Sequence, residues 1–208
     1  MYLLLLNLNR KVFYQGIISS ILLCLTLPLV AESRTINKLA GKKALLNDRV
    51  KAAFILNIAR YVEWPENRLH NEVRLCFLNQ NPLGSAVNNI RNKHIKIHPL
   101  EIRTIPSLQL HNDCNILFLT QQQMADIAAQ LKNKTPAENK EKYSLLFTKD
   151  VLIIGDLSTK TTNTEKIEGV MVFLTRQKTR FGIEISRKVL TNSSLILSSE
   201  LLKLSRID

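Results

Sequence analysis

Val50-Lys-Ala-Ala-Phe-Ile-Leu-Asn-Ile-Ala-Arg-Tyr-Val-Glu-Trp-Pro65 is the stretch that decides the fold, because it predicts a helix that is apolar around most of its circumference. At about 100° per residue, Asn57, Arg60 and Glu63 fall on one narrow polar stripe, and the other positions are mostly apolar. A helix of this kind needs cover on nearly every side. We therefore expect a buried core helix, with Arg60 as the residue on its stripe that is available to contact something else.

Residues at each end of this stretch predict where the helix begins and ends. Asn47 or Asp48 can cap its start. Pro65 restricts Trp64 to extended geometry, so the helix should end there. The basic segment 32–47 lacks a strong apolar period and is interpreted as a flexible lead-in or a frayed first helical turn.

The N-terminus has the order of a secretory signal peptide. Arg10 and Lys11 precede the apolar run 17–30, and the small residue Ala31 follows it before the chain becomes polar. The apolar core is short for a bilayer span, so residues 1–31 are predicted to be a cleaved signal peptide; a retained anchor is the alternative. The predicted organisation is completed by a single α/β domain over residues 48–208.

The whole chain has 208 residues and a formal net charge of +12, and it remains strongly basic after the predicted cleavage. Nucleic acid is a common partner of basic proteins, but export would remove it from reach, and the basic residues are scattered rather than striped. We expect no nucleic-acid partner. The charge instead favours an acidic protein partner or an anionic membrane face.

Two cysteines, Cys76 and Cys114, remain after the predicted cleavage, since Cys24 lies in the signal segment. A cysteine pair in an oxidising compartment suggests a disulfide. Two buried free thiols are the alternative. The spacing lacks the Cys-x-x-Cys pattern of a redox catalyst, so a structural role is favoured over a catalytic one.

Strand and helix patterns alternate along the mature chain. An α/β domain is expected, with helices layered on a mainly parallel sheet and a C-terminal antiparallel hairpin. The predicted strands and helices are strands 72–78, 94–98, 113–119 and 151–154, helices 85–92 and 121–132, a loop over 132–142, a polar loop over 158–166, and a short strand with a serine-capped helix over 195–204. If the two cysteine-bearing strands are neighbours in the sheet, their sulfurs can lie within bonding reach.

The hairpin is predicted from residues 170–174 and 180–185, which flank a polar connection at 175–179. On its second arm, Phe181 shares a face with Ile183 and Ile185, while Arg180 and Glu184 share the other. Arg180 and Glu184 can simply pair with each other, and Phe181 can belong to the core. As exposed parts of the hairpin, these three residues are nonetheless the hypothesis for a partner contact, together with Arg60.

The sequence contains no motif for catalysis. Its isolated glycines form neither a phosphate loop nor a nucleophile elbow, and no enzyme is predicted. The histidines have no carboxylate or cysteine at ligand spacing, so no metal or cofactor is expected; they are His70, His94, His98 and His111. Asn79 and Asp156 follow predicted strands, where open α/β sheets place ligands, which leaves a small-ligand-binding protein as the alternative function.

Several motifs in order along the chain resemble the YfiR family of periplasmic proteins, and the resemblance covers nearly the whole mature chain. The Trp-Pro helix combined with the Ser-Ser-x-Leu-Leu ending is its most specific part. The residues that carry it are Lys51 to Pro65, Leu75-Cys-Phe-Leu78, Asn81-Pro-Leu-Gly84, Asp113-Cys-Asn-Ile-Leu-Phe118, Gly169-Val-Met-Val-Phe173, Arg180-Phe-Gly-Ile-Glu-Ile185 and Ile196 to Leu204.

The resemblance implies an exported, non-enzymatic repressor of an inner-membrane diguanylate cyclase of the YfiN type or of a related sensor protein. It also implies sequestration by an outer-membrane lipoprotein of the YfiB type, and a family disulfide between Cys76 and Cys114. A homodimer stays open. The sequence departs from the family pattern at Asn79, where glycine is common, and at Ser186, where asparagine often follows the hairpin.

Overall fold

The computed structural model describes residues 27–208 except 70, 110–113, 134 and 160–165. The chain has two units, residues 1–46 and 47–208. Residues 1–26 of the predicted signal peptide lie outside the described part of the chain. Helix α2 (Leu27–Arg60) begins directly after residue 26. Among the described residues, no helix is both long and apolar enough to cross a membrane.

Helix α2 is longer at its start than the sequence predicts. Segment 32–47, expected to be flexible, is helical, and the cap expected at Asn47 or Asp48 is not needed because both positions lie within α2. Alanine, leucine and lysine are frequent in this segment, and these residues favour helix even without an apolar period. The helix ends at Arg60, earlier than predicted, because residues 62 and 63 form a strand instead.

The second unit contains every strand that the described part of the chain forms. The strands are β1 (Val62–Glu63), β2 (Val73–Leu78), β3 (His94–Ile95), β4 (His98–Ile105), β5 (Ile116–Leu119), β6 (Leu152–Asp156), β7 (Val172–Gln177), β8 (Arg180–Ile185), β9 (Ile196–Leu197) and β10 (Arg206–Ile207). The helices that follow α2 are η1 (Glu66–Arg68), η2 (Gly84–Asn89), α3 (Gln121–Lys132), α4 (Pro136–Lys142), η3 (Ser144–Phe147), α5 (Arg187–Thr191) and α6 (Ser199–Leu204).

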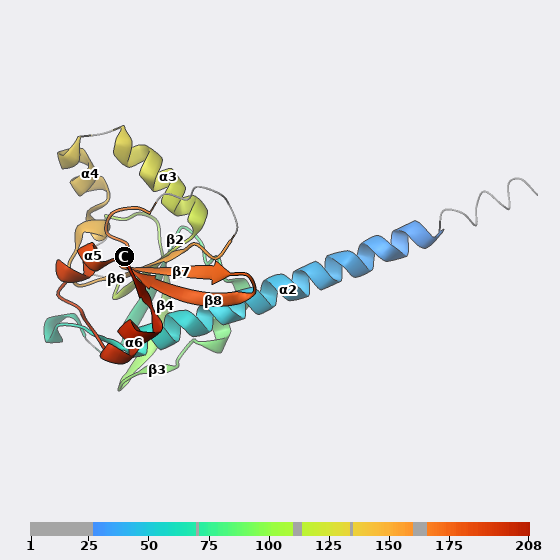
Figure 1. Cartoon of the computed structure of the whole chain (residues 1–208), viewed down its shortest axis with the longest axis horizontal. Coiled ribbons are helices and arrows are strands. Elements are labelled where there is room, and N and C mark those ends of the chain that lie inside the picture. Colours follow the sequence, from blue (N-terminus) through green and yellow to red (C-terminus); the bar gives the residue numbers. More distant parts are fainter. Residues whose placement is uncertain (1–26, 70, 110–113, 134, 160–165) are drawn as a thin grey trace, which may run out of the picture. The chain divides into compact units, whose positions relative to one another are not determined.

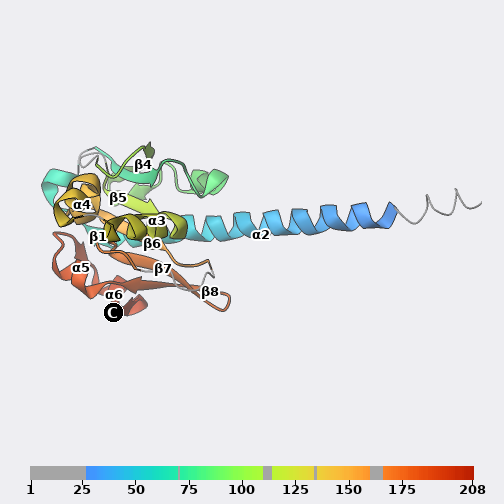
Figure 2. The same ribbon diagram turned by 90° about the horizontal axis from the view of Figure 1, so that it is seen from above.

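An eight-stranded sheet in the order β10-β8-β7-β6-β5-β2-β4-β3 organises this unit. Its central strands β4, β2, β5, β6 and β7 are parallel, and β7 and β8 form the predicted antiparallel hairpin. Figure 2 shows β4 and β5 toward one edge of the sheet and β7 and β8 toward the other edge. Strands β1 and β9 form a separate antiparallel pair. The α/β class predicted from the sequence is therefore confirmed.

The sheet is covered by helices on both faces. Met124, Ile127 and Ala128 of α3 pack with Cys76 and Leu117 on one face. Figure 1 shows α3 and α4 (yellow) on one side of the strands and the last turns of α2 (cyan) on the other, where Ala52, Ile55 and Ile58 are buried. This two-sided burial explains why the central strands are continuous apolar runs.

Three local predictions are corrected by the structure. Residues 94–98 form a hairpin turn rather than one strand, because Lys96 has a positive φ of 54° and reverses the chain into β4. The loop expected at 132–142 contains α4, since Pro136 opens a helix instead of breaking one. The hairpin connection is confined to two residues, Lys178 and Thr179, because the first arm, β7, extends to Gln177 and so includes three residues of the segment expected to be polar loop.

Candidate partner-binding surface

Phe181 on β8 faces helix α2. Its ring centroid lies 6.0 Å from that of Phe54, and the Arg176 guanidinium lies 5.1 Å from the Phe181 centroid. Arg180, the neighbouring residue, is exposed. Because the side chains of a strand alternate, Phe181 belongs to the α2 side of the hairpin.

Arg60, the last residue of α2, and Tyr61, directly after it, lie beside the hairpin residue Ile183. Arg60 is exposed, and its Nε donates a 3.3 Å hydrogen bond to the His94 carbonyl oxygen. Tyr61 belongs to the helix positions that were expected to be apolar and covered, but its side chain is 39% exposed. A cavity of about 490 Å³ lies here and is lined by Phe54, Asn57, Ile58, Arg60, Tyr61, Ile183, Leu201 and Leu204.

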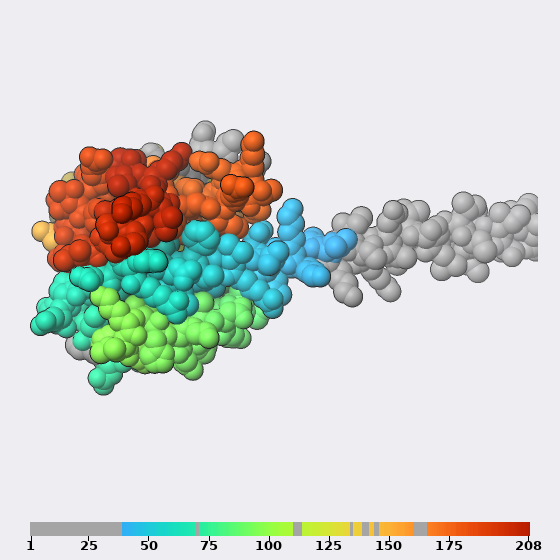
Figure 3. Space-filling view, turned by 60° about the horizontal axis from the view of Figure 1, so that its bottom comes forward, coloured from blue at the N-terminus to red at the C-terminus, as the bar shows by residue number. Residues whose placement is uncertain are grey.

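Helix α6 completes the surface. The Ser198 side chain accepts a hydrogen bond from the Leu201 amide and caps α6, as the sequence predicts. Leu201 is buried, whereas Leu204, one turn later, is 71% exposed. Figure 3 shows this C-terminal segment (red) beside the surface of α2 (cyan).

A second cavity of about 320 Å³ continues from the first and shares Ile183 and Leu204 with it. Its lining residues are Thr175, Gln177, Arg180, Phe181, Gly182, Ile183, Leu204, Ser205 and Arg206. We call the residues that line the two cavities the α2–β8–α6 surface. Arg60, Arg180 and Phe181, three of the four residues in the partner hypothesis, thus lie on one continuous surface.

Glu184, the fourth residue, lies on the opposite face of β8 and is 6% exposed. It accepts hydrogen bonds from Lys166 and from Arg206 of β10, the latter at 2.7 Å. Burial alone would raise the pKa of the Glu184 carboxyl, but the hydrogen bonds from Lys166 and Arg206 outweigh burial and hold that pKa below its usual value. Lys166 also forms a 2.6 Å ion pair with Asp208. Glu184 of the hairpin therefore holds the C-terminal residues in place, directly through Arg206 and indirectly through Lys166.

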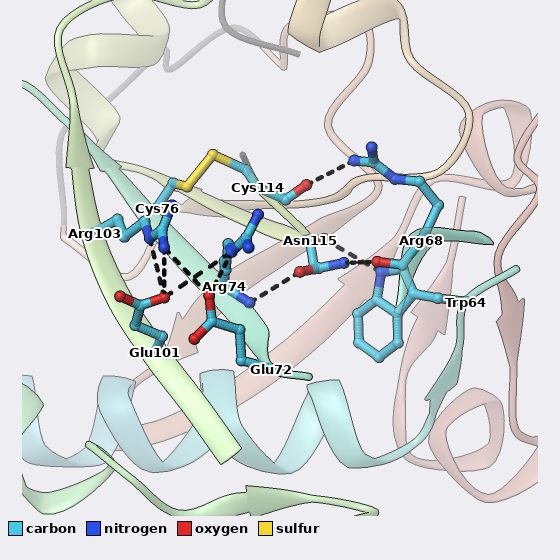
Figure 4. The surroundings of a disulfide bond; sticks show 9 residues. All are labelled: Trp64, Arg68, Glu72, Arg74, Cys76, Glu101, Arg103, Cys114 and Asn115. Atoms are coloured by element: carbon cyan, nitrogen blue, oxygen red, sulfur yellow. Dashed lines mark hydrogen bonds and ion pairs between the residues drawn. A yellow bond between two sulfur atoms is a disulfide. The ribbon is translucent and has the colours of Figure 1, made fainter. Parts of the chain in front are cut away.

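The disulfide joins Cys76 of β2 to Cys114, which precedes β5, with a Cα–Cα distance of 5.8 Å. The two strands are parallel neighbours, as the disulfide hypothesis requires. Figure 4 shows that Asn115 lies beside the bridge and contacts Trp64, Arg68 and Arg74.

Glu72, directly before β2, and Arg74 of β2 form ion pairs with residues of the neighbouring strand β4. Arg103 Nη2 lies 3.2 Å from a Glu72 carboxylate oxygen and 2.9 Å from Glu101. Figure 4 shows these four charged side chains beside Cys76. They bind one another across the β2–β4 register, which pairs Arg74 with Glu101 and Cys76 with Arg103.

Asp156, one of the two positions in the ligand-binding alternative, has its carboxylate occupied by neighbours. Lys51 Nζ lies 2.7 Å from one oxygen, and the Ser158 amide and hydroxyl donate to the other. Within the described parts of the chain, no group of three or more histidine, cysteine, aspartate or glutamate side chains could hold a metal ion. His70 and His111 lie outside those parts.

A sequence model of the YfiR/HmsC-like family matches residues 48–206. The chain belongs to the YfiR/HmsC-like family. Membership of this family indicates a periplasmic regulator of cyclic-di-GMP signalling rather than a catalyst. No curated protein matches the chain significantly.

The structure explains one departure of this YfiR/HmsC-like chain from its family pattern. Asn79 has a positive φ of 63°, a backbone conformation that glycine adopts freely and that asparagine tolerates better than most residues. At the second departure, Ser186 precedes α5 as its N-cap, without a side-chain capping hydrogen bond.

Sequence reasoning missed Tyr61 and Leu204 as members of the surface. Both residues continue apolar patterns whose other members are buried, such as Ile58 and Leu201. Periodicity identifies an apolar position, but it does not show whether another element covers it. No local signal therefore distinguishes these two residues from core.

Proposed function

We propose that this YfiR/HmsC-like protein binds the periplasmic sensor domain of an inner-membrane diguanylate cyclase through the α2–β8–α6 surface and represses the enzyme. The observation that carries the proposal is the exposed apolar side chain of Leu204 between two adjoining cavities. Exposed apolar surface rimmed by polar residues is typical of a protein interaction site, and Tyr61 in the first cavity adds to the exposed apolar surface of Leu204.

Arginines around the apolar centre support the same proposal. Arg60, Arg180 and Arg206 line the two cavities, and Tyr61 is part of the first. Arginine and tyrosine are over-represented among the residues that dominate binding energy in protein interfaces. The sensor domain should therefore present an apolar side chain surrounded by acidic residues.

Repression would follow if the protein binds the inactive arrangement of the sensor more tightly than the active one. A partner can shift a conformational equilibrium only by its difference in affinity for the two states. A ratio of about one hundred corresponds to roughly 2.7 kcal/mol. Sequestration by an outer-membrane lipoprotein would reverse repression if the lipoprotein covers the same surface.

Binding of the purified protein to the isolated sensor domain of the cyclase tests the proposal. Leu204→Asp places a charge in the shared wall of the cavities and should weaken binding at least tenfold. The matched control is Ile97→Asp, because Ile97 is 83% exposed and lines neither cavity. Equal affinity of both variants for the sensor domain would exclude the α2–β8–α6 surface.

A further inference from the structure

A larger cavity, of about 640 Å³, lies at the carboxyl edge of the parallel sheet. It shares no lining residue with the α2–β8–α6 surface. Its walls come from the ends of β2 and β4, from α3, and from Glu138, Lys142 and Tyr143. This volume is within the range of small-molecule sites in proteins.

The cavity lies where the chain connections of two neighbouring strands diverge. Strands β2 and β5 are adjacent and parallel, but the chain leaves β2 toward β4 and leaves β5 toward β6. Open α/β sheets bind ligands at such a point, beyond the carboxyl ends of the strands. Asn79, directly after β2, and Gln123, on the helix that follows β5, both line the cavity.

Hydrogen bonds fix two walls of the cavity. The Gln123 amide donates to the Leu78 carbonyl oxygen at 2.8 Å and accepts from the Thr120 amide at 2.9 Å, which ties α3 to the end of β2. The Gln130 side-chain oxygen accepts from the Tyr143 hydroxyl at 2.6 Å. The side chains that shape the site are therefore held before any ligand arrives.

The polar groups of the lining are mostly planar amides and carboxylates. In the described part of the chain, the Asn79 side chain makes no hydrogen bond, and Asp126 uses one oxygen for the Gln122 amide at 2.8 Å. Gln109 contributes a further amide, and Leu108 and Ile127 contribute apolar surface. Amides offer a donor and an acceptor on one group, which matches hydroxyls that do the same.

Charges in the lining are mixed, with Asp126 and Glu138 opposed by Lys142. No single sign of charge dominates, so the lining does not favour a strongly ionic ligand. We propose that this cavity binds a neutral, hydroxyl-rich molecule of mono- or disaccharide size, held by hydrogen bonds to Asn79 and Asp126. The proposal is independent of the cyclase partner, because it concerns a different part of the surface.

Isothermal titration of the purified protein with D-glucose, N-acetyl-D-glucosamine and trehalose tests this proposal. At least one of these sugars should bind, and Asn79→Gly should weaken that binding about fivefold through the loss of a hydrogen bond. Glycine suits the positive φ at this position, so the variant should fold. The matched control is Asn92→Gly, because Asn92 has a similar φ of 59° and does not line the cavity.

Two variants at Asp126 separate a hydroxyl-rich ligand from an amine. Asp126→Asn keeps an acceptor and should change sugar affinity less than Asp126→Ala, whereas both variants would weaken amine binding equally. Parallel titrations use L-lysine and putrescine. Binding of these amines in place of the sugars, no sugar binding at millimolar concentration, or sugar binding unaffected by Asn79→Gly would each overturn the proposal.

Discussion

Asn115 shows how one side chain holds together the region around the disulfide. It is 5% exposed, accepts a 2.9 Å hydrogen bond from the Arg74 amide and donates one of the same length to the Arg68 carbonyl oxygen. Its own carbonyl oxygen accepts from the Trp64 indole at 3.3 Å. The only tryptophan of the chain is thereby positioned by a residue that the sequence analysis did not single out.

Asn115→Ala should lower the free energy of unfolding by about 2–3 kcal/mol, because two backbone groups lose their partners in a buried environment. Urea denaturation followed by Trp64 fluorescence measures this change. Asn57→Ala, at an exposed position of α2, is the control and should change the free energy by less than about 0.5 kcal/mol. A similar effect of both substitutions would contradict this role of Asn115.

Glu184 makes stability depend on pH in the acid range. Because its pKa and that of Asp208 are lowered in the folded protein, each carboxylate contributes stability above its unfolded pKa, and this contribution is lost as pH falls through the folded value. The free energy of unfolding should therefore decrease below about pH 4–5. Lys166 acts at the other extreme: its pKa is raised, mainly by Asp208, so its contribution is lost only at strongly alkaline pH.

Glu184→Gln should flatten this acid dependence, as measured by thermal unfolding between about pH 3 and 7. Glu168→Gln is the control, because Glu168 forms only an exposed ion pair with Lys188. An unchanged slope in Glu184→Gln would show that Glu184 is not the group responsible.

At the residue level, the sequence correctly predicted which side chains lie on opposite faces of a strand, because the alternation of side chains along the strand alone decides this. The pattern separated Phe181 from Arg180 and Glu184, and the structure has Phe181 and Glu184 on opposite faces of β8. It could not show that Glu184 is covered, because its partners Lys166 and Arg206 come from other segments of the chain. Exposure depends on tertiary contacts that a single strand does not encode.

At the scale of elements, local signals predicted some boundaries well and others poorly. Helix α3 was predicted with its observed end, and a capping box between Thr120 and Gln123 fixes its start. Strand β4 was missed, because Glu101 and Arg103 interrupt its apolar pattern. Those charges are compensated in the sheet, because Arg74 of β2 lies opposite Glu101 in the register and Glu72, directly before β2, forms an ion pair with Arg103.

Among the links between secondary-structure elements, the disulfide should have the clearest effect on the free energy of unfolding. It joins residues 38 positions apart. Replacing both cysteines with alanine should lower the free energy of unfolding by about 3–4 kcal/mol on the chain-entropy account. Denaturation of the oxidised protein and the double variant measures the difference, and thiol labelling without reductant should leave Cys76 and Cys114 of the native protein unmodified.

At the scale of the whole molecule, the α2–β8–α6 surface combines segments that are far apart in the sequence. Arg60 comes from the first helix of the described chain, Phe181 from the hairpin and Leu204 from the last helix. The alternation of strand and helix patterns predicted the fold class, which the sheet topology confirms, and the family resemblance predicted the type of regulator, which the family match supports. The surface itself could not be predicted, since its cavities exist only after these three elements pack.

The cellular concentration of cyclic-di-GMP, measured by mass spectrometry, tests the central claim most directly. Deletion of the gene should raise the concentration, and expression of the wild-type protein or of Ile97→Asp should lower it again, whereas Leu204→Asp should not. An unchanged concentration on deletion, or full repression by Leu204→Asp, would contradict the claim that this protein represses a diguanylate cyclase through the α2–β8–α6 surface.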